Sequence, residues 1–257
     1  LQQALNSKGI DARIEAISDA PGLSRVRYAL PSPLPAVSLI IPTRDQPDLL
    51  QRCLASIHRQ ATWPDLDLIV VENGSVQART RSQLRQLEET GRACVIRADI
   101  PFNWSALNNP GVEHSRGAVP GFLNDDIEVR SADWLQELVS QVLNPEIGVV
   151  GPSLRYPDGR IQHAGVILGQ SGDGIWHAHQ GAAASSSGHG HRLRVVQTVS
   201  AVTGAALFTR RDVFESLGSF DTRFPVNSND VDSCLRAGAT GWRCLYTPHV
   251  WLLHHES

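Results

Sequence analysis

Methionine is absent from this chain of 257 residues, and cysteine is scarce, with only Cys53, Cys94, Cys234 and Cys244. No two cysteines stand in a C-x-x-C pair, which argues against a zinc knuckle or a dithiol redox motif. Four cysteines are too few for a disulfide scaffold in a chain of this length, so we expect reduced thiols. Because the chain begins with Leu1 and holds no methionine, we expect it to be a fragment of a longer protein.

Long apolar runs and an excess of positive charge are missing as well. No stretch approaches the roughly 18 consecutive apolar residues of a transmembrane helix, and no charged-then-apolar leader opens the chain. The formal net charge of −3 excludes a strongly basic nucleic-acid binder. With 41% hydrophobic and 19% charged residues, the composition is that of an ordinary globular protein. We therefore expect a cytoplasmic protein, or one held peripherally at the inner face of the membrane, with no nucleic-acid partner.

The short motifs of several enzyme classes are absent too. No G-x-G-x-x-G or G-K-[ST] loop is present, which argues against nucleotide binding of the dinucleotide or P-loop kind. No G-x-S-x-G turn marks an α/β-hydrolase, and no H-E-x-x-H marks a zinc site.

A proline-rich stretch divides the chain. Three prolines within Pro31–Pro35 predict an extended connector, and we place a domain boundary there. Residues 1–35 are expected to be an N-terminal segment with its linker, the tail of a preceding region. Residues 36–257 are expected to form the main domain.

After the linker, apolar runs and amphipathic stretches alternate. The runs predict buried strands at Val37–Ile41, Leu66–Val71, Ala93–Arg97, Val119–Leu123 and Ile147–Val150. Helices are predicted between them, after Pro47, over Gln77–Thr90, over Ser105–Ser115 and after Ser131. This alternation predicts an α/β fold with a mostly parallel sheet, whose ligands bind beyond the carboxyl ends of the strands.

The second half of the chain is less regular. Residues 169–192 are rich in Gly, Ala, Ser and His, which predicts a long mobile loop that could close over a site. Beyond it we predict an apolar segment at Ala201–Thr209, helices at Arg210–Leu217 and Asn229–Ala237, and a late strand at Trp242–Tyr246.

Two acidic clusters could carry chemistry. Asn124-Asp125-Asp126 follows a predicted strand, and oxygen ligands from such a turn suit Mg²⁺ or Mn²⁺ that holds substrate phosphates. The alternative is a plain helix-entry turn, because Asp is common there. Asp230 opens a predicted helix, where it is either a helix cap or a general base.

Histidines gather at the end of the sequence and around the glycine-rich segment. His254 and His255 follow an apolar run, where one of them could complete a metal shell. Histidines in or near a glycine-rich loop are more often solvated than metal ligands, and here they are His163, His177, His179, His189 and His191.

Taken together, these motifs resemble glycosyltransferase family 2, whose members have the GT-A fold. The similar stretches are, in order, V-S-L-I-I-P-T-R-D-Q-P-D-L-L, L-I-V-V-E-N-G-S, P-F-N-W-S-A-L-N-N-P-G-V-E-H-S-R-G, F-L-N-D-D-I-E-V, Y-P-D-G-R-I-Q-H-A-G-V, V-S-A-V-T-G-A-A-L, N-D-V-D-S-C-L-R and L-L-H-H-E-S. The resemblance covers residues 37–257 and is greatest to bacterial enzymes that build O-antigen, rhamnan and similar surface polysaccharides. It implies a Rossmann-type, mostly parallel sheet flanked by helices, with a nucleotide-binding half at 36–150 and an acceptor-side half at 151–257.

The resemblance also implies roles for particular residues. Asp230 matches the catalytic base, and Asp126 matches the metal ligand, to which His254 or His255 would add another. The positions implied to bind the nucleotide sugar are Pro42, Thr43, Arg44, Glu72, Asn109, Asp125 and Gly204. The implied cofactor is Mg²⁺ or Mn²⁺, and the implied partners are a nucleoside-diphosphate sugar and a glycan or lipid-linked glycan acceptor.

The function implied is inverting transfer of a sugar to a hydroxyl of a growing surface glycan. Two departures from the family pattern stand out. Glu72 occupies a position where Asp is usual, and Pro120-Gly121 replaces two apolar residues in a strand expected to be central. The alternatives are a non-catalytic domain that binds nucleotide or carbohydrate, and a nucleotidyltransferase that attacks phosphorus.

Overall fold

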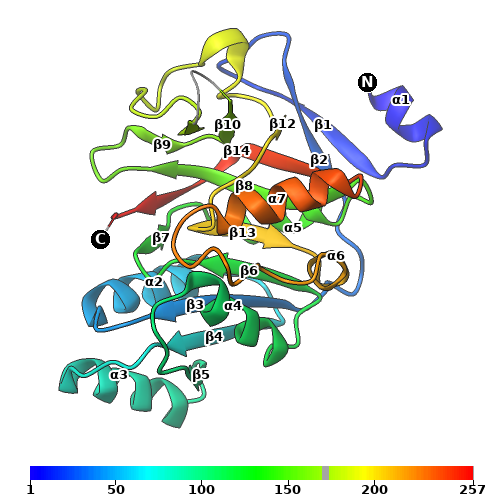
Figure 1. Cartoon of the computed structure of the whole chain (residues 1–257). Coiled ribbons are helices and arrows are strands. Elements are labelled where there is room, and N and C mark those ends of the chain that lie inside the picture. The colour runs from blue at the N-terminus through cyan, green and yellow to red at the C-terminus, as the bar shows by residue number, and fades with distance from the viewer. Residues whose placement is uncertain (170–173, 257) are drawn as a thin grey trace.

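The computed structural model describes residues 1–169 and 174–256, and its main feature is one large twisted sheet (Figure 1). The strand order is β12-β14-β8-β13-β6-β3-β4-β5, with β7 beside β14 and β9 beside β8. These strands are β3 (Val37–Thr43), β4 (Leu66–Glu72), β5 (Cys94–Arg97), β6 (Val119–Leu123), β7 (Ile127–Val129), β8 (Ile147–Arg155), β9 (Ile161–His163), β12 (Gln197–Val199), β13 (Ala206–Thr209) and β14 (Arg243–His254).

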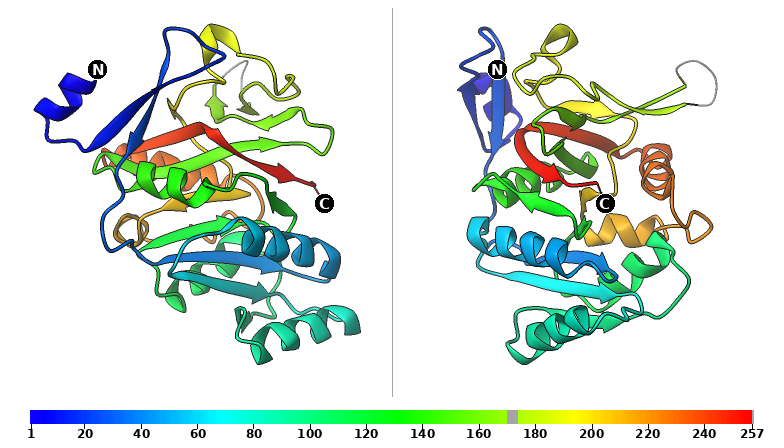
Figure 2. Two further views of the ribbon diagram at one scale, coloured as in Figure 1. Left: turned by 180° about the vertical axis from the view of Figure 1, so that it is seen from behind. Right: turned by 90° about the vertical axis from the view of Figure 1, so that its left-hand side faces the viewer.

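Helices cover both faces of this sheet (Figure 2). They are α2 (Pro47–Gln60), α3 (Ala78–Glu89), α4 (Trp104–Glu113), α5 (Trp134–Val142), α6 (Arg211–Ser216) and α7 (Asn229–Ala239). Alternate residues of β3 enter different cores, as strand geometry requires. Leu39 and Ile41 pack with apolar side chains of α2, α3 and α5, whereas Ile40 packs with those of α4, α6 and α7.

The predicted α/β fold is confirmed, and one strand makes the sheet mixed. Strand β3 runs parallel to both β4 and β6, and β8 runs parallel to β14. Strand β13 lies between β6 and β8 and is antiparallel to both. Consequently the carboxyl ends of β3, β4, β6, β8 and β14 meet along one edge of the sheet.

Pro120 and Gly121 fit into the central strand β6 for separate reasons. The N–H of Val119 donates to Ala36 on the β3 side, so the nitrogen of Pro120 faces β13, where the ladder ends at Gly121 and Phe208. A Cβ atom on Gly121 would lie 2.4 Å from the Phe208 ring, so glycine is what lets this ring cross the strand. The unusual pair is therefore accommodated by the packing of β13.

The two strands predicted at Ile147–Val150 and Trp242–Tyr246 are much longer than expected. The predicted strands end before Pro152 and Pro248, whereas β8 and β14 continue past these prolines as a parallel pair. A register shift between Thr247 and Trp251 accommodates Pro248 within β14.

The glycine-rich segment, predicted as one long loop, is partly built into the structure. Strand β10 (Val166–Leu168) pairs with β11 (Ile175–His177), and a 3₁₀ turn covers His189–His191. Leu193 is buried in a small cluster that includes Tyr246 of β14. Residues 170–173 of that predicted loop lie outside the described residues.

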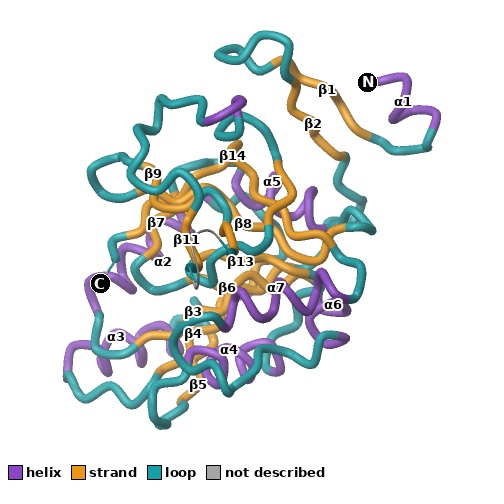
Figure 3. Tube along the Cα trace, turned by 45° about the horizontal axis from the view of Figure 1, so that its top comes forward, coloured by secondary structure: helices purple, strands orange, loops and turns teal. Residues whose placement is uncertain are grey.

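Residues 1–30, in which no regular pattern was evident, form a helix and a hairpin at the periphery of the molecule (Figure 3). These elements are α1 (Gln2–Ser7), β1 (Ala12–Ala16) and β2 (Ser24–Tyr28). The hairpin packs against α5, where Arg25 Nη2 lies 2.5 Å from Glu137 Oε2. Among the residues that the structure describes, no helix combines the length and apolar character needed to cross a membrane.

Candidate functional site

The edge where the parallel strands end carries a cluster of polar side chains. Thr43 closes β3, and Asp125 follows β6. Thr43 Oγ1 donates to Asp125 Oδ2 over 2.6 Å, which fixes the orientation of this carboxylate. Burial raises the pKa of Asp125 to about 6, against the opposing effect of the Thr43 bond.

A cavity opens beside this pair, and we name it the Thr43 cavity. It is lined by Pro42, Thr43, Arg44, Gln46, Asn73, Phe102, Trp104, Leu107, Asn124, Asp125 and Asp126. The cavity therefore brings together residues that the sequence separates by about 80 positions, and it combines apolar side chains with one cation and two carboxylates.

A chain of contacts runs from Asp126 through His254 and Gln162 to Glu256, the last described residue. Asp126 Oδ1 lies 3.1 Å from Nε2 of His254, and Nδ1 of His254 lies 2.8 Å from Oε1 of Gln162. The Gln162 Nε2 donates to Glu256 over 2.8 Å, which leaves its Oε1 as an acceptor toward the histidine. His254 Nδ1 must therefore carry a hydrogen, and its Nε2 faces the Asp126 carboxylate.

This arrangement fits a divalent cation. The carboxylate oxygen of Asp126 and Nε2 of His254 lie close enough to share a proton or to bind the same cation. Oxygen and imidazole ligands suit Mn²⁺, and oxygen ligands suit Mg²⁺. In the described part of the chain, no three His, Cys, Asp or Glu side chains come together as a complete metal cage. The remaining ligands would have to come from substrate or water.

Asp230 lies near the start of α7 in a second cavity, which we name the Asp230 cavity. Its Oδ2 accepts a 2.7 Å hydrogen bond from the N–H of Gly204, and its Oδ1 accepts one of 2.8 Å from the N–H of Val231. Burial raises the pKa of Asp230, against the opposing effect of these two bonds. The carboxylate thus satisfies an N–H at the helix start and also faces a cavity, so both interpretations from the sequence have support.

Trp104 and Asn124 separate the two cavities. The indole Nε1 of Trp104 donates to Asn124 Oδ1 over 3.3 Å, and both residues line both cavities. A Cβ atom on Gly204 would lie 3.0 Å from the Trp104 ring, so the glycine permits the close approach of the indole. The Asp230 cavity also contains His177 and His254.

Three of the predicted residues line neither the Thr43 cavity nor the Asp230 cavity. Both polar atoms of the Asn109 side chain bind the backbone of Phe220, at 2.9 and 3.0 Å, so its amide stabilises the packing of α4. The Glu72 carboxylate accepts the N–H of Ser75 and closes the turn after β4. His255 lies 3.4 Å from Glu128, because successive residues at the end of β14 point in opposite directions. The His255 backbone N–H donates to the Asp126 carbonyl, but it is the His254 ring that lies beside the Asp126 carboxylate.

Sequence reasoning missed several residues that line or support these cavities. Trp104 and Gln162 lie within quoted motifs, but neither carries a titratable or nucleophilic group that would single it out in the sequence. The sequence predicted solvated side chains for His163 and His177, yet His163 is fully buried. Their placement depends on how β9, β10 and β11 pair, for which the sequence offered no pattern.

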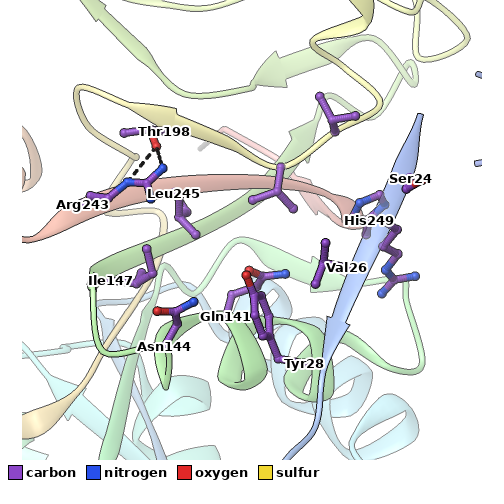
Figure 4. A pocket seen from close by; sticks show the side chains of 13 residues that line it. Ser24, Val26, Tyr28, Gln141, Asn144, Ile147, Thr198, Arg243, Leu245 and His249 are labelled. Atoms are coloured by element: carbon purple, nitrogen blue, oxygen red, sulfur yellow. Dashed lines mark hydrogen bonds between the residues drawn. The ribbon is translucent and has the colours of Figure 1, made fainter. Parts of the chain in front are cut away.

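A further cavity lies at the opposite end of the parallel strands, near the starts of β8 and β14. Figure 4 shows Arg243 on one side, hydrogen-bonded to Thr198 at 2.5 Å and 3.2 Å, and His249 near Ser24 on the other. None of the residues predicted to be functional lines this cavity, which is closed on one side by the N-terminal hairpin.

The sequence matches the family described as Glycosyl transferase family 2 over residues 38–218, more than half of the chain. The chain belongs to glycosyl transferase family 2, as its ordered motifs predicted. It is 43% identical over 225 residues to the uncharacterized protein y4gI of Sinorhizobium fredii, and 40% identical over 246 residues to the O-antigen biosynthesis protein RfbC of Myxococcus xanthus. These alignments cover 87% and 95% of this chain but only 25% and 19% of the two relatives.

A more distant relative and two solved structures extend the comparison. The chain is 27% identical over 161 residues to N-acetylglucosaminyl-diphospho-decaprenol L-rhamnosyltransferase of Mycobacterium tuberculosis, covering 60% of this chain and 48% of that one. Mannosyltransferase PcManGT from Pyrobaculum calidifontis, in complex with GDP-Man and Mn²⁺, has a TM-score of 0.67 at 20% identity, over 89% of this chain and 59% of that one. GalNAc-T7 with UDP, GalNAc and Mn²⁺ has a TM-score of 0.71 at 15% identity, over 86% and 43%. At these identities the likeness concerns the fold alone, and it confirms the predicted GT-A fold.

Proposed function

We propose that this chain moves a sugar from a nucleoside-diphosphate sugar to a hydroxyl group of a growing surface glycan, with inversion at the anomeric carbon. The observation that carries the proposal is the position of two acidic sites on either side of Trp104 and Asn124. Asp126 lines the Thr43 cavity and Asp230 lines the other, and His254, whose ring faces Asp126, lines the Asp230 cavity. A transferase needs such an arrangement, because the group that leaves and the group that attacks must reach one carbon atom together.

The Thr43 cavity would hold the nucleotide. Phe102 and Leu107 offer apolar contact to a base, and Arg44 offers a cation to the phosphates. Asp125, held by Thr43, can accept hydrogen bonds from hydroxyl groups of a ribose.

Asp126 and His254 would hold a divalent cation together with the donor diphosphate. When bound, Mg²⁺ or Mn²⁺ would supply positive charge that neutralises the diphosphate as it leaves. Gln162 would keep the His254 ring in the orientation and tautomer that direct Nε2 toward this site. The Mn²⁺ complexes of the two solved relatives in fold are consistent with this assignment.

Asp230 would act as the general base. Its carboxylate takes the proton of the acceptor hydroxyl while that oxygen bonds to the anomeric carbon, and the bond from this carbon to the diphosphate oxygen breaks. The hydrogen bond from Gly204 holds the carboxylate in place during this step. Attack from the face opposite the diphosphate inverts the configuration of the carbon.

The acceptor class is proposed from the relatives. RfbC is described as an O-antigen biosynthesis protein, and the mycobacterial relative bears a name that specifies a lipid-linked sugar as acceptor. We therefore propose a glycan or a lipid-linked glycan as the acceptor of this chain.

The test is to incubate the protein with UDP-, GDP- and dTDP-sugars, Mn²⁺ and glycan acceptors, and to measure the released nucleotide. We expect nucleoside diphosphate from one donor class, with loss of release in Asp126→Asn. A matched control is Asp232→Asn, because Asp232 pairs with Arg236 at 2.8 Å and does not line the cavities. Release of pyrophosphate would indicate a nucleotidyltransferase, and binding of nucleotide without any release would indicate a non-catalytic domain.

A further inference from the structure

A fully buried histidine, His163, and a partly buried one, His177, form a pair at the Asp230 cavity. His163, at the end of β9, is fully buried, and its Nδ1 lies 2.7 Å from Nδ1 of His177 at the end of β11. The two rings meet edge to face, with centroids 4.9 Å apart. Only His177 lines the cavity, so His163 supports it from behind.

The hydrogen bonds around His163 determine which nitrogen atoms of the pair carry hydrogen. Backbone N–H groups of Gly165 and Thr203 both point at His163 Nε2, over 3.3 and 3.4 Å, so this nitrogen accepts. The hydrogen of a neutral His163 must then lie on Nδ1, which donates to Nδ1 of His177. This contact requires a bare Nδ1 on His177, and burial, which lowers the pKa of both histidines, favours the neutral rings that the geometry needs. It follows that His177 carries its hydrogen on Nε2, the nitrogen not used by His163.

The groups facing His177 show what this N–H could bind. Asp230 and His254 line the same cavity, so His177 shares it with the proposed base and a proposed metal ligand. A neutral histidine with hydrogen on Nε2 cannot accept the acceptor's proton there. An N–H directed at the attacking oxygen would weaken its nucleophilicity, whereas one directed at the departing oxygen would stabilise the charge that develops on it.

We propose that His177 is a further binding residue, whose Nε2–H donates to the diphosphate of the nucleotide-sugar donor, and that His163 is a positioning residue that fixes the tautomer of His177. This proposal rests on the proposed function. It assigns to these two histidines a role distinct from metal binding and from proton abstraction. No proton is transferred from either ring, so the step remains balanced by Asp230 alone.

The kinetic test uses variants that keep or remove the hydrogen-bond donor at His177. We expect His177→Leu to lower kcat by about 100-fold or more, as for loss of one donor at a developing charge. His177→Gln places an amide N–H near the position of Nε2 and should recover most of that loss. His163→Leu should lower kcat less than His177→Leu, because it frees His177 to adopt either tautomer. His189→Leu, an exposed histidine of the same segment that does not line the cavity, is the control.

A second measurement does not depend on activity. In protein labelled with ¹⁵N-histidine, long-range ¹H–¹⁵N spectra distinguish protonated from bare ring nitrogens. We expect hydrogen on Nε2 of His177 and on Nδ1 of His163, and we expect a mixture of tautomers for His177 in His163→Leu. Hydrogen on Nδ1 of His177 in the unaltered protein would overturn the proposal.

The outcomes separate this inference from the proposed function. If the unaltered protein releases nucleoside diphosphate and His177→Leu does so at the same rate, the role of His177 is wrong and the proposed function stands. If the unaltered protein turns over none of the nucleotide sugars, the proposed function fails, and the role of His177 fails with it. Recovery by glutamine but not by leucine, together with the expected tautomers, would support the full proposal.

Discussion

Each carboxylate oxygen of Asp230 has a backbone partner, and the two partners belong to different parts of the chain. Val231 is the next residue of the same helix, whereas Gly204 belongs to the loop before β13. The two hydrogen bonds therefore hold the carboxylate from two sides and restrict its rotation. This is why capping and catalysis were hard to separate from the sequence: the same atoms would serve both.

Asp230→Asn separates the two roles. Asn has nearly the size and shape of Asp and still accepts one of the two N–H groups, so we expect only a modest loss of stability, about 1 kcal/mol. It cannot take a proton, so kcat should fall by about two to four orders of magnitude while donor affinity is kept. Steady-state kinetics and nucleotide titration check both expectations. An active Asp230→Asn enzyme would contradict the assignment.

The pH profile offers a second measurement on the same residue. Burial raises the pKa of Asp230. The base works only when it is deprotonated, so kcat/KM should rise with pH through a value above that of an ordinary aspartate. The residual activity of Asp230→Asn should lack this acidic limb.

Gln162→Leu tests the orientation of His254. Without the acceptor at Nδ1, the His254 ring can place its hydrogen on Nε2, the nitrogen that faces Asp126. Loss of such a supporting group typically weakens metal affinity about 10–100-fold. Titration of the protein with Mn²⁺, followed by electron paramagnetic resonance, measures this directly. Gln180→Leu is the control, since the side-chain amide of Gln180 donates to the Tyr156 hydroxyl at the surface and does not contact His254. Equal Mn²⁺ affinity in both variants would contradict the role of Gln162.

At the scale of elements, the first half of the sheet could be predicted and the second half only in part. Strands β3, β4, β5 and β6 were predicted within two residues, because each is a short and mainly apolar run between polar segments. Strand β14 was predicted only over Trp242–Tyr246, because its continuation past Pro248 needs a register shift that depends on pairing with β8. The choice between His254 and His255 had the same origin, because it depends on where β14 ends relative to Asp126.

The contact between β6 and β13 leads to a prediction about stability. Gly121→Ala would place a Cβ atom 2.4 Å from the Phe208 ring, which is buried on all sides. Overpacking of this kind costs about 1–3 kcal/mol, so the denaturation midpoint should fall. The double variant with Phe208→Leu should lose less than the sum of the single variants.

Gly238→Ala is the matched control for that change. Gly238 lies in α7, and a Cβ atom there would meet nothing within 4 Å. Alanine is favoured over glycine in helices by about 1 kcal/mol, so this variant should be as stable as the parent or more so. A loss of stability equal to that of Gly121→Ala would rule out the steric explanation.

At the scale of the whole molecule, the N-terminal hairpin covers part of the sheet edge remote from the acidic site. His249 is partly buried there and lines the cavity shown in Figure 4. Burial is the main cause that lowers the pKa of His249 to about 4. The charges of Glu137 and Glu15 oppose this shift, and those of Arg25 and Arg27 add to it. The unfolded chain takes up this proton near pH 6.5, but the folded protein does so only near pH 4. Stability from this histidine is therefore present above about pH 6.5 and is lost as the pH falls toward 4.

His249→Gln should flatten that dependence. Its free energy of unfolding should fall less than that of the parent between pH 6.5 and 4, by up to about 3 kcal/mol. Urea denaturation at several pH values gives the comparison, with His189→Gln at the exposed turn as the control. Parallel pH curves for the parent and His249→Gln would contradict the prediction.

The wall formed by Trp104 and Asn124 has a consequence for how two substrates meet. Because the same indole contacts both cavities, a ligand that fixes the ring on one side changes the free energy of binding on the other. Thermodynamic linkage makes this effect reciprocal, so a donor that improves acceptor affinity is itself held more tightly once the acceptor is present. Under the proposed function, Trp104 would thus couple the affinity for the sugar donor to the affinity for the acceptor.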